Sequence, residues 1–229
     1  MSMPPRLSVI GDLERQDHFF LVPEHRCYFW GEYTPFEHTG GQKWNFSPTN
    51  QLINNFKKKM DRVGQMDWRY KASAIERVAT AFSQTMRWDQ LGLQNPVLVP
   101  MPPSKRRNDP LYDPRMLDML RSMAGRVQTP LNVQDILSFD GSCDASHEAV
   151  ARPTPDELYA AMSVDTSAMA GQNPPGVILI FDDMLTTGAH FLAALRRLSE
   201  PFPGVPVIGV FVARRVIPNP FADFDDLDF

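Results

Sequence analysis

The sequence predicts an α/β domain built on a mainly parallel sheet with helices on its faces. Three short apolar runs, residues 97–100, 176–181 and 207–213, have the length and character of buried parallel strands. They alternate with segments whose apolar residues recur every three or four positions, the period of an amphipathic helix. Strands that alternate with helices are typical of parallel sheets. At 229 residues the chain suits one large domain, or a domain with a modest appendage.

The first half of the chain contributes two helices and one strand to this pattern. Residues 19–46 have no clean period and predict short strands and loops. Ser47 and Pro48 carry the start signal of a helix. Its apolar face consists of Leu52, Ile53, Phe56 and Met60. A second helix has its apolar face at Ile75, Val78, Ala79, Phe82 and Met86, and the strand at residues 97–100 follows it.

The second half repeats the alternation. Asp113 and Pro114 are typical of an N-cap and a first helical residue, and they precede the apolar positions Met116, Leu117 and Leu120. Residues 133–137 predict another strand. Thr154 and Pro155 repeat the helix start signal. The strand at 176–181, a helix at 191–198 and the strand at 207–213 complete the pattern.

The composition excludes several classes of protein. The chain has 23 Lys and Arg against 27 Asp and Glu, and this mild acidity argues against a protein that coats nucleic acid by bulk charge. Its two cysteines, Cys27 and Cys143, form no Cys-x-x-Cys pair, which excludes a zinc ribbon or a disulfide framework. The apolar runs are far shorter than the ~20 residues of a membrane helix, and the N-terminus lacks the features of a signal peptide. We therefore expect a cytoplasmic protein with no membrane contact.

The most informative segment is residues 177–190, where an apolar strand leads to Asp182 and Asp183 and then to the turn Thr186-Thr187-Gly188. At the carboxyl edge of a parallel sheet, such a turn presents backbone N–H groups and the positive end of a helix to a phosphate. Adjacent carboxylates accept hydrogen bonds from sugar hydroxyls and can lie near Mg²⁺. The segment therefore predicts a sugar-phosphate site; the alternative is a strand end followed by a capped helix.

This segment resembles the phosphoribosyl-pyrophosphate (PRPP) motif of type I phosphoribosyltransferases. The resemblance implies the type I fold, with Asp182 and Asp183 holding the ribose and Mg²⁺. It also implies that the rest of the motif surrounds the 5′-phosphate. That part of the motif comprises Met184, Leu185, Thr186, Thr187, Gly188, Ala189 and His190. The family usually has Thr or Ser where His190 stands, and an imidazole can also donate to phosphate.

A second segment matches the same family. The strand at 97–100 leads into a Pro-rich loop with three cations, which comprises Pro103, Ser104, Lys105, Arg106 and Arg107. In type I enzymes the loop after an earlier strand binds the pyrophosphate, and charge-assisted donors suit that leaving group. The resemblance makes Lys105 and Arg107 catalytic, together with Asp182 and Asp183. The alternative is a solvated basic loop.

A wider resemblance concerns a subgroup. Residues 28–62, with the stretch Asn-Gln-Leu-Ile-Asn-Asn-Phe-Lys-Lys, look like the corresponding region of ComF-like phosphoribosyltransferase homologues, and the similarity spans roughly residues 28–215. The zinc-binding cysteines of that group are missing here. The resemblance implies a small N-terminal hood at residues 1–46, a core at 47–218 and an acidic tail at 219–229.

The implied reaction displaces pyrophosphate from C1 of PRPP by a nitrogen nucleophile, with Mg²⁺ and a cover that excludes water. Residues 138–152 have the composition of such a lid, with His147 and Arg152 among its ionisable side chains; the alternative for His147 is an exposed loop histidine. No residue stands out as a general base. The family sometimes places an acid where Thr186 stands.

The excess negative charge lies in the last nine residues. From Phe221 to Phe229 the chain has four Asp and no cation, so residues 1–220 balance at 23 cations and 23 anions. The final seven residues resemble the acidic tip of bacterial single-stranded-DNA-binding proteins, although Asp228 stands where that tip has Pro. The resemblance implies docking of Phe229 on a protein partner with a basic, apolar pocket. The alternative is a solvating end whose Phe224 or Phe229 packs on its own domain.

Three functions remain open. The first is a PRPP-dependent phosphoribosyltransferase acting on a nitrogenous base or nucleotide, with a homodimer as a further expectation. The second is a non-catalytic or regulatory homologue that senses PRPP or a nucleotide in DNA uptake, repair or phage defence. The third is a nucleic-acid-binding module that uses residues 57–59 and 105–107, which the neutral charge of residues 1–220 disfavours.

Overall fold

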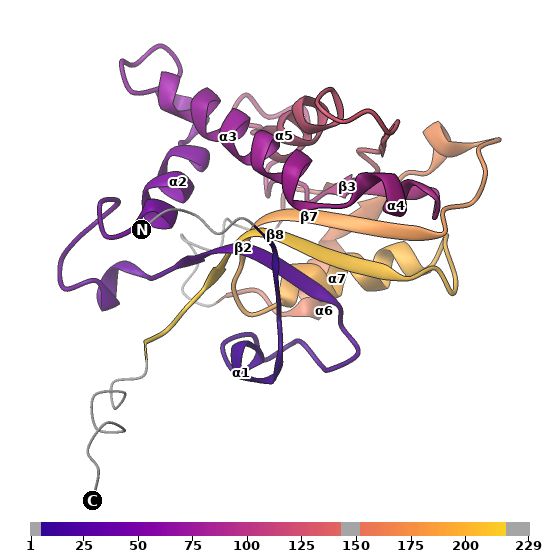
Figure 1. Ribbon diagram of the computed structural model, residues 1–229, viewed down its shortest axis with the longest axis horizontal. Helices are drawn as coiled ribbons and strands as arrows, with labels where there is room; N and C mark the ends of the chain where they lie inside the picture. Colours follow the sequence, from indigo (N-terminus) through magenta and orange to yellow (C-terminus); the bar gives the residue numbers. More distant parts are fainter. Residues whose placement is uncertain (1–5, 143–151, 219–229) are drawn as a thin grey trace, which may run out of the picture.

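A computed structural model describes residues 6–142 and 152–218, and a six-stranded sheet forms its centre (Figure 1). Its strands, in the order β1-β2-β8-β7-β3-β4, are Ser8–Val9, Cys27–Tyr33, Val207–Arg215, Val177–Leu185, Pro96–Pro100 and Asn132–Val133. All neighbours run parallel except β1, which pairs antiparallel with β2 at one edge. The α/β class and the mainly parallel sheet are confirmed, and the arrangement is compatible with a Rossmann-like fold.

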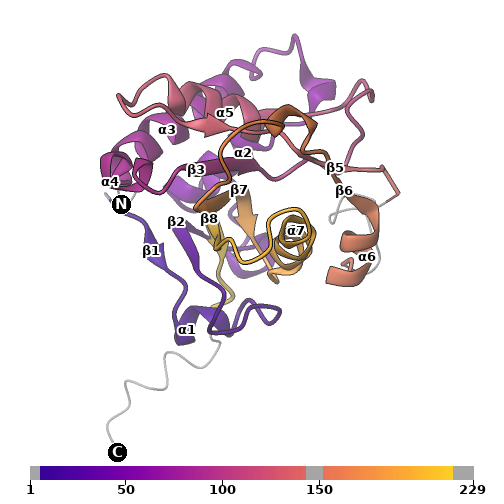
Figure 2. The same cartoon turned by 90° about the vertical axis from the view of Figure 1, so that its right-hand side faces the viewer.

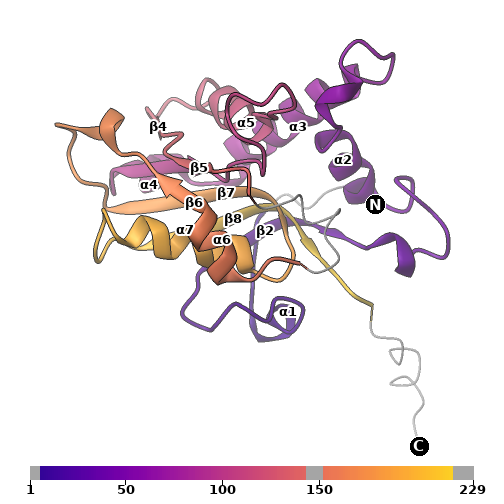
Figure 3. The same cartoon turned by 180° about the vertical axis from the view of Figure 1, so that it is seen from behind.

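Helices form a layer on each face of this sheet. The seven helices of the described residues are α1 Asp12–Arg15, α2 Pro48–Phe56, α3 Arg69–Thr85, α4 Trp88–Gly92, α5 Arg115–Ala124, α6 Pro155–Ala161 and α7 Ala189–Ser199. In Figure 2, α2, α3 and α5 lie on one side of the strands and α7 lies on the other, with α6 beside it. Two further strands, β5 Leu137–Phe139 and β6 Met162–Val164, pair antiparallel next to α6 and α7 (Figure 3).

The sheet separates two apolar cores because successive side chains of a strand point to opposite faces. Along β7, Ile178 and Ile180 pack toward α7, while Leu179 and Phe181 pack toward α2, α3 and α5. All four side chains are almost completely buried. Each contributes roughly 1.5–3 kcal/mol of transfer free energy, so the central strand is held on both faces and its carboxyl end has a well-defined position.

The predicted helix starts are confirmed at two places. Ser47 accepts a hydrogen bond from the amide of Asn50 at 3.0 Å, and Thr154 forms a reciprocal capping box with Glu157. At the third start, the helix begins at Arg115 and Pro114 takes the N-cap position. One carboxylate oxygen of Asp113 accepts a hydrogen bond from the backbone amide of Arg115 at 3.2 Å. Its other oxygen binds two cations, the side chains of Lys71 and Arg115.

Two strand predictions were wrong in extent. Residues 133–137 do not form one strand: β4 ends at Val133 beside β3, and β5 begins at Leu137, which pairs with Val164 in the other sheet. The strand expected to end at residue 181 continues to Leu185, because β8 pairs with it as far as Arg214. Asp182 and Asp183 therefore lie within the strand.

The N-terminal residues expected to form a hood contribute to the central sheet through β2, and the loop after α1 lies over the end of β7. The expected lid residue His147 and the tail at 219–229 lie outside the described residues, so their roles stay predictions. Within residues 6–142 and 152–218, none of the helices combines the length and the apolar character that a bilayer span requires.

Gly188, between β7 and α7, allows a specific test of this packing. Its φ is +89°, and a Cβ there would lie 2.8 Å from Cδ2 of Leu21. We expect Gly188→Ala to lower the free energy of unfolding by about 2–5 kcal/mol, because left-handed strain adds to overpacking. Gly204→Ala is the matched control: φ is +76° with no atom within 4 Å of the added Cβ, so only about 1–2 kcal/mol of strain is expected. Equal losses in denaturant unfolding would show that the Leu21 contact does not constrain the turn.

Candidate functional site

In the turn that joins β7 to α7, several backbone amides have no acceptor among the described residues. The carbonyl oxygen of Thr187 accepts the amide of Phe20 at 3.0 Å, and that of Thr186 bonds the His18 ring. Because the C=O and N–H of a peptide unit point in opposite directions, the amides of Thr187 and Gly188 face away from this loop. Among the described residues, no acceptor binds the amides of Thr187, Gly188 or His190. An eleven-residue helix follows, so the turn suits an anion.

The loop after β3 begins next to this edge. β3 pairs with β7 up to Pro100 and Phe181, and the amide of Met101 donates to the Phe181 carbonyl at 2.7 Å. The loop that carries the predicted pyrophosphate-binding residues 103–107 therefore starts beside Phe181, the residue before Asp182.

The three cations of this loop are not equivalent. Arg107 forms an ion pair with Asp135 at 2.8 Å and donates to the Leu137 carbonyl at 3.2 Å, and Arg106 donates to the Asp140 carbonyl. Both arginines therefore anchor the loop to residues 135–140, which include β5 and the residues on either side of it. Lys105 is exposed and has no ion pair with any described residue. Of the predicted cations it is the one whose charge is available to a ligand.

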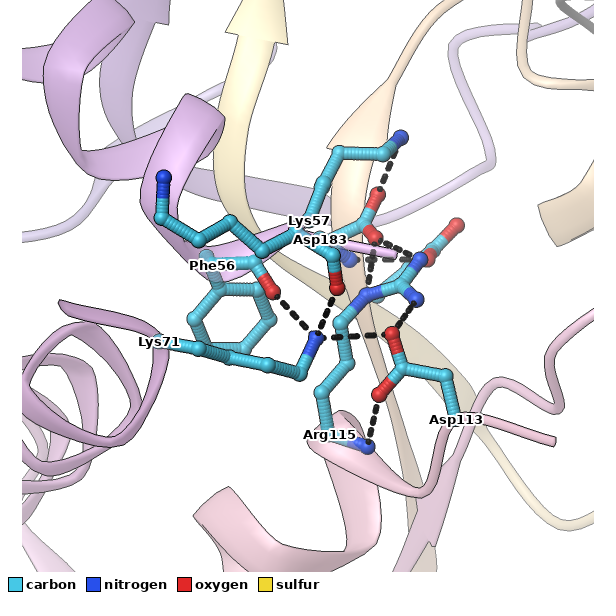
Figure 4. Close-up of polar contacts among 8 residues, drawn as sticks. Phe56, Lys57, Lys71, Asp113, Arg115 and Asp183 are labelled. Atoms are coloured by element: carbon cyan, nitrogen blue, oxygen red, sulfur yellow. Dashed lines mark hydrogen bonds and ion pairs between the residues drawn. The ribbon is translucent and has the colours of Figure 1, made fainter. Parts of the chain in front are cut away.

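Asp183 lies at the centre of an ionic network that the sequence did not reveal (Figure 4). The residue as a whole is 4 % exposed. One carboxylate oxygen is 3.1 Å from Nζ of Lys57, and the other accepts from Nε and a terminal nitrogen of Arg115, at 2.8 and 2.5 Å. Three donors from two cations thus satisfy this carboxylate within the protein.

The network continues through Arg115 to Asp113 at 2.7 Å and from Asp113 to Nζ of Lys71 at 2.7 Å. Lys71 is buried and also donates to the backbone carbonyls of Phe56 and Lys58, both at 2.9 Å. Figure 4 shows these groups converging from α2, α3, α5 and β7. Buried charges are tolerated only when they are paired and hydrogen-bonded, as they are here.

The two neighbouring carboxylates differ sharply in acidity. Burial, and then the charge of Asp183, raise the pKa of Asp182 to about 7. Burial acts in the same direction on Asp183, but Lys57 and Arg115 outweigh it and hold the pKa of Asp183 well below its usual range. Asp183 is therefore a permanent anion, whereas Asp182 can take up or release a proton near neutral pH. The sequence identified no such proton-exchanging group.

His190 is a neutral donor. Burial lowers the pKa of its imidazole to about 4, so it carries no charge at pH 7. Its ring meets Phe139 edge-on with centroids 6.1 Å apart. At the first turn of α7, a neutral imidazole can still donate one hydrogen bond to an anion.

The two acids do not fit a directly held Mg²⁺. Asp183 already neutralises two cations, and a divalent ion beside them would be repelled. The raised pKa of Asp182 favours its protonated form more than in an ordinary carboxylate, which weakens it as a ligand. No group of three or more candidate metal-ligating side chains occurs within the part of the chain that the structure describes.

Arg152, expected in the lid, lies beside the same turn. It lines a cleft of about 240 Å³ together with Thr187 and with residues from the N-terminal loop and the end of β8. The structure therefore places Arg152 beside the turn, and the loop with Lys105 begins next to β7, the strand that carries both acids.

The buried network predicts a large effect at Lys71. Lys71→Met would leave two carbonyls without their donor and Asp113 with one cation fewer. We expect it to lower the free energy of unfolding by about 3–5 kcal/mol. Arg126→Met, which removes an exposed ion pair with Glu76, is the control and should cost at most about 1 kcal/mol in the same urea titration. Similar losses for both variants would contradict the role of the network.

The raised pKa of Asp182 predicts a pH dependence. Because the folded-state pKa lies above the unfolded value of about 3.9, the stability it contributes is full below pH ~4 and is lost as the pH rises through about 7. Asp182→Asn removes the titrating carboxyl group and with it this pH-dependent contribution to stability. We expect its unfolding free energy, relative to wild type, to increase by about 1–3 kcal/mol between pH 4 and pH 8. A constant difference across this range, measured by urea titration at each pH, would contradict it.

Comparison with known proteins assigns no family. No model of a known protein family matches the chain, and no curated protein sequence matches it. A functional assignment therefore depends on the residues and the geometry described above.

Proposed function

We propose that this chain is a type I phosphoribosyltransferase-like protein that binds PRPP at the carboxyl edge of β7 and β3. The observation that carries the proposal is the turn at residues 186–190, whose amides at the start of α7 have no acceptor among the described residues. The loop that carries Lys105 starts from β3, the neighbour of β7 in the sheet. One anion site at a helix start and a second basic loop beside it suit a ligand with a phosphate at each end.

The parts of PRPP can be assigned by chemistry. The 5′-phosphate belongs at the turn, where Thr186 and neutral His190 add side-chain donors to the amides. Asp182, half-buried and able to donate or accept, faces the ribose hydroxyls. Ser104 and Lys105 receive the pyrophosphate. Mg²⁺ in this proposal accompanies PRPP on its own phosphate oxygens, and no protein carboxylate is assigned to it.

In the transfer reaction, a nitrogen atom of the acceptor forms a bond to C1 while the bond from C1 to the pyrophosphate oxygen breaks. The bonding electron pair leaves with pyrophosphate, where Lys105 stabilises the developing negative charge. The proton released from the acceptor nitrogen passes to pyrophosphate or to water. A carboxyl group with a pKa near 7, such as Asp182, suits proton exchange in the same site.

A second candidate is a PRPP- or nucleotide-sensing protein without catalysis. The observation that favours it is the satisfied carboxylate of Asp183, whose oxygens already accept from Lys57 and Arg115. A site with one fully paired acid and one partly protonated acid can bind a ligand while stabilising little positive charge on the ribose.

Calorimetry with PRPP, with and without Mg²⁺, tests binding, and pyrophosphate release across a panel of bases tests catalysis. We expect Asp182→Asn and Lys105→Gln each to weaken PRPP binding about tenfold or more, because each loses a direct ligand contact. Lys43→Gln, at an exposed lysine outside the site, is the control and should bind like wild type. Absence of PRPP binding, or unchanged binding in both site variants, would refute the proposal. Binding without pyrophosphate release would favour the sensor.

A further inference from the structure

The cleft of about 240 Å³ next to the turn is formed by four distant parts of the chain. Its lining residues are Phe19, Phe20, Arg152, Pro153, Thr187 and Arg215. A cavity of about 150 Å³ is enough for benzene, so this cleft has room for one substituted ring. Thr187 belongs both to the cleft and to the proposed phosphate turn, which places a ligand in the cleft directly beside PRPP.

The cleft has two arginines whose side chains form no ion pair with any described residue. The side chain of Arg215 makes no hydrogen bond within the described ranges, and its Nε is buried without an acceptor. Burial, and then the neighbouring charge of Arg152, lower the pKa of Arg215, while the charges of Asp17 and Glu37 oppose this shift without reaching the guanidinium as ion pairs. Arg152 likewise has no ion pair in the described ranges. Arg214, the next residue along β8, shows the contrast: it pairs with Glu32 at 2.6 Å. An anion in the cleft would supply the acceptor that the guanidinium groups lack.

The same cleft has two aromatic walls. The rings of Phe19 and Phe20 lie 4.5 Å apart at an angle of 48°. Phe19 is 67 % exposed, which is a high value for a residue of this size in a loop that is otherwise anchored to the turn. Aromatic faces stack on planar ligands, and guanidinium groups bind carboxylates with two parallel hydrogen bonds.

We infer that the cleft binds a planar aromatic carboxylate of one ring, with the ring against Phe19 and Phe20 and the carboxylate against Arg152 and Arg215. This inference rests on the proposed function for one further step: if the ring contains nitrogen, an aromatic carboxylate of this kind is the acceptor class of this protein. An uncharged base would leave both arginines without an acceptor, and an aliphatic anion would leave Phe19 exposed to water.

Two matched pairs of probes test the inference: nicotinate against nicotinamide, and orotate against uracil, measured by calorimetry with and without PRPP. We expect at least one carboxylate to bind ten times or more tightly than its uncharged partner. Arg215→Gln should remove this preference, and Phe19→Ala should weaken the carboxylate three- to tenfold. If Arg215→Gln fails to fold, Arg152→Gln replaces it, because that side chain is exposed. Arg126→Gln, at an exposed surface pair, is the control and should bind like wild type.

Three results would overturn the inference: equal binding of charged and uncharged partners, unchanged preference in both arginine variants, or equally tight binding of acetate and inorganic phosphate. PRPP titrations keep this test separate from that of the proposed function. Arg215→Gln should still bind PRPP, because its assigned contacts lie elsewhere. If wild type binds a ring carboxylate through Arg215 and Phe19 but does not bind PRPP, the cleft stands and the phosphoribosyltransferase proposal falls. If wild type binds PRPP but shows no carboxylate preference, the phosphoribosyltransferase proposal stands and the inference about the cleft falls.

Discussion

The pairing of buried Asp183 with Lys57 and Arg115 is the constraint on which the arrangement of this site depends. An unpaired carboxylate at 4 % exposure would destabilise the fold by several kcal/mol. Its partners come from the end of α2 and the start of α5, and the network extends through Asp113 to Lys71 on α3. The network therefore links three helices to β7 at the carboxyl edge of the sheet, the edge at which the turn and the loop after β3 both begin.

The same pairing gives different chemical properties to two neighbouring acids, Asp182 and Asp183, that look equivalent in the sequence. Since Asp183 stays ionised, its negative charge adds to burial and raises the pKa of its neighbour to about 7. Asp182 becomes the group that can exchange a proton, while Asp183 acts through the cations that it holds in place. Lys57 is the more exposed of these partners, with 28 % of its side chain accessible, so its ammonium group can face both Asp183 and a ligand phosphate.

Much of the fold could be predicted because its signals are local. A capping residue followed by proline marks α2 and α6, and continuous apolar runs mark β3, β7 and β8. The Asp-Asp and Thr-Thr-Gly segments likewise lie within ten residues, so the site could be placed at the end of β7. The ionic network could not be predicted, because Lys57 and Asp183 are 126 positions apart and no local pattern joins them. The division between β4 and β5 also depends on distant partners, Leu98 for one and Val164 for the other.

The loop between α1 and β2 connects the turn with the cleft. His18 and Phe20 bind the carbonyl oxygens of Thr186 and Thr187, which directs the opposite amides away from this loop, and Phe19 and Phe20 line the cleft. Leu21 packs on Gly188, so this loop cannot move far without disturbing the left-handed turn. A ligand that orders Phe19 would therefore also restrain the amides of Thr187 and Gly188, to which we assign the phosphate. Since coupling between two binding sites is reciprocal, occupation of the turn would restrain the cleft to the same degree. Residues 18–21 of this loop thus connect the two proposed sites.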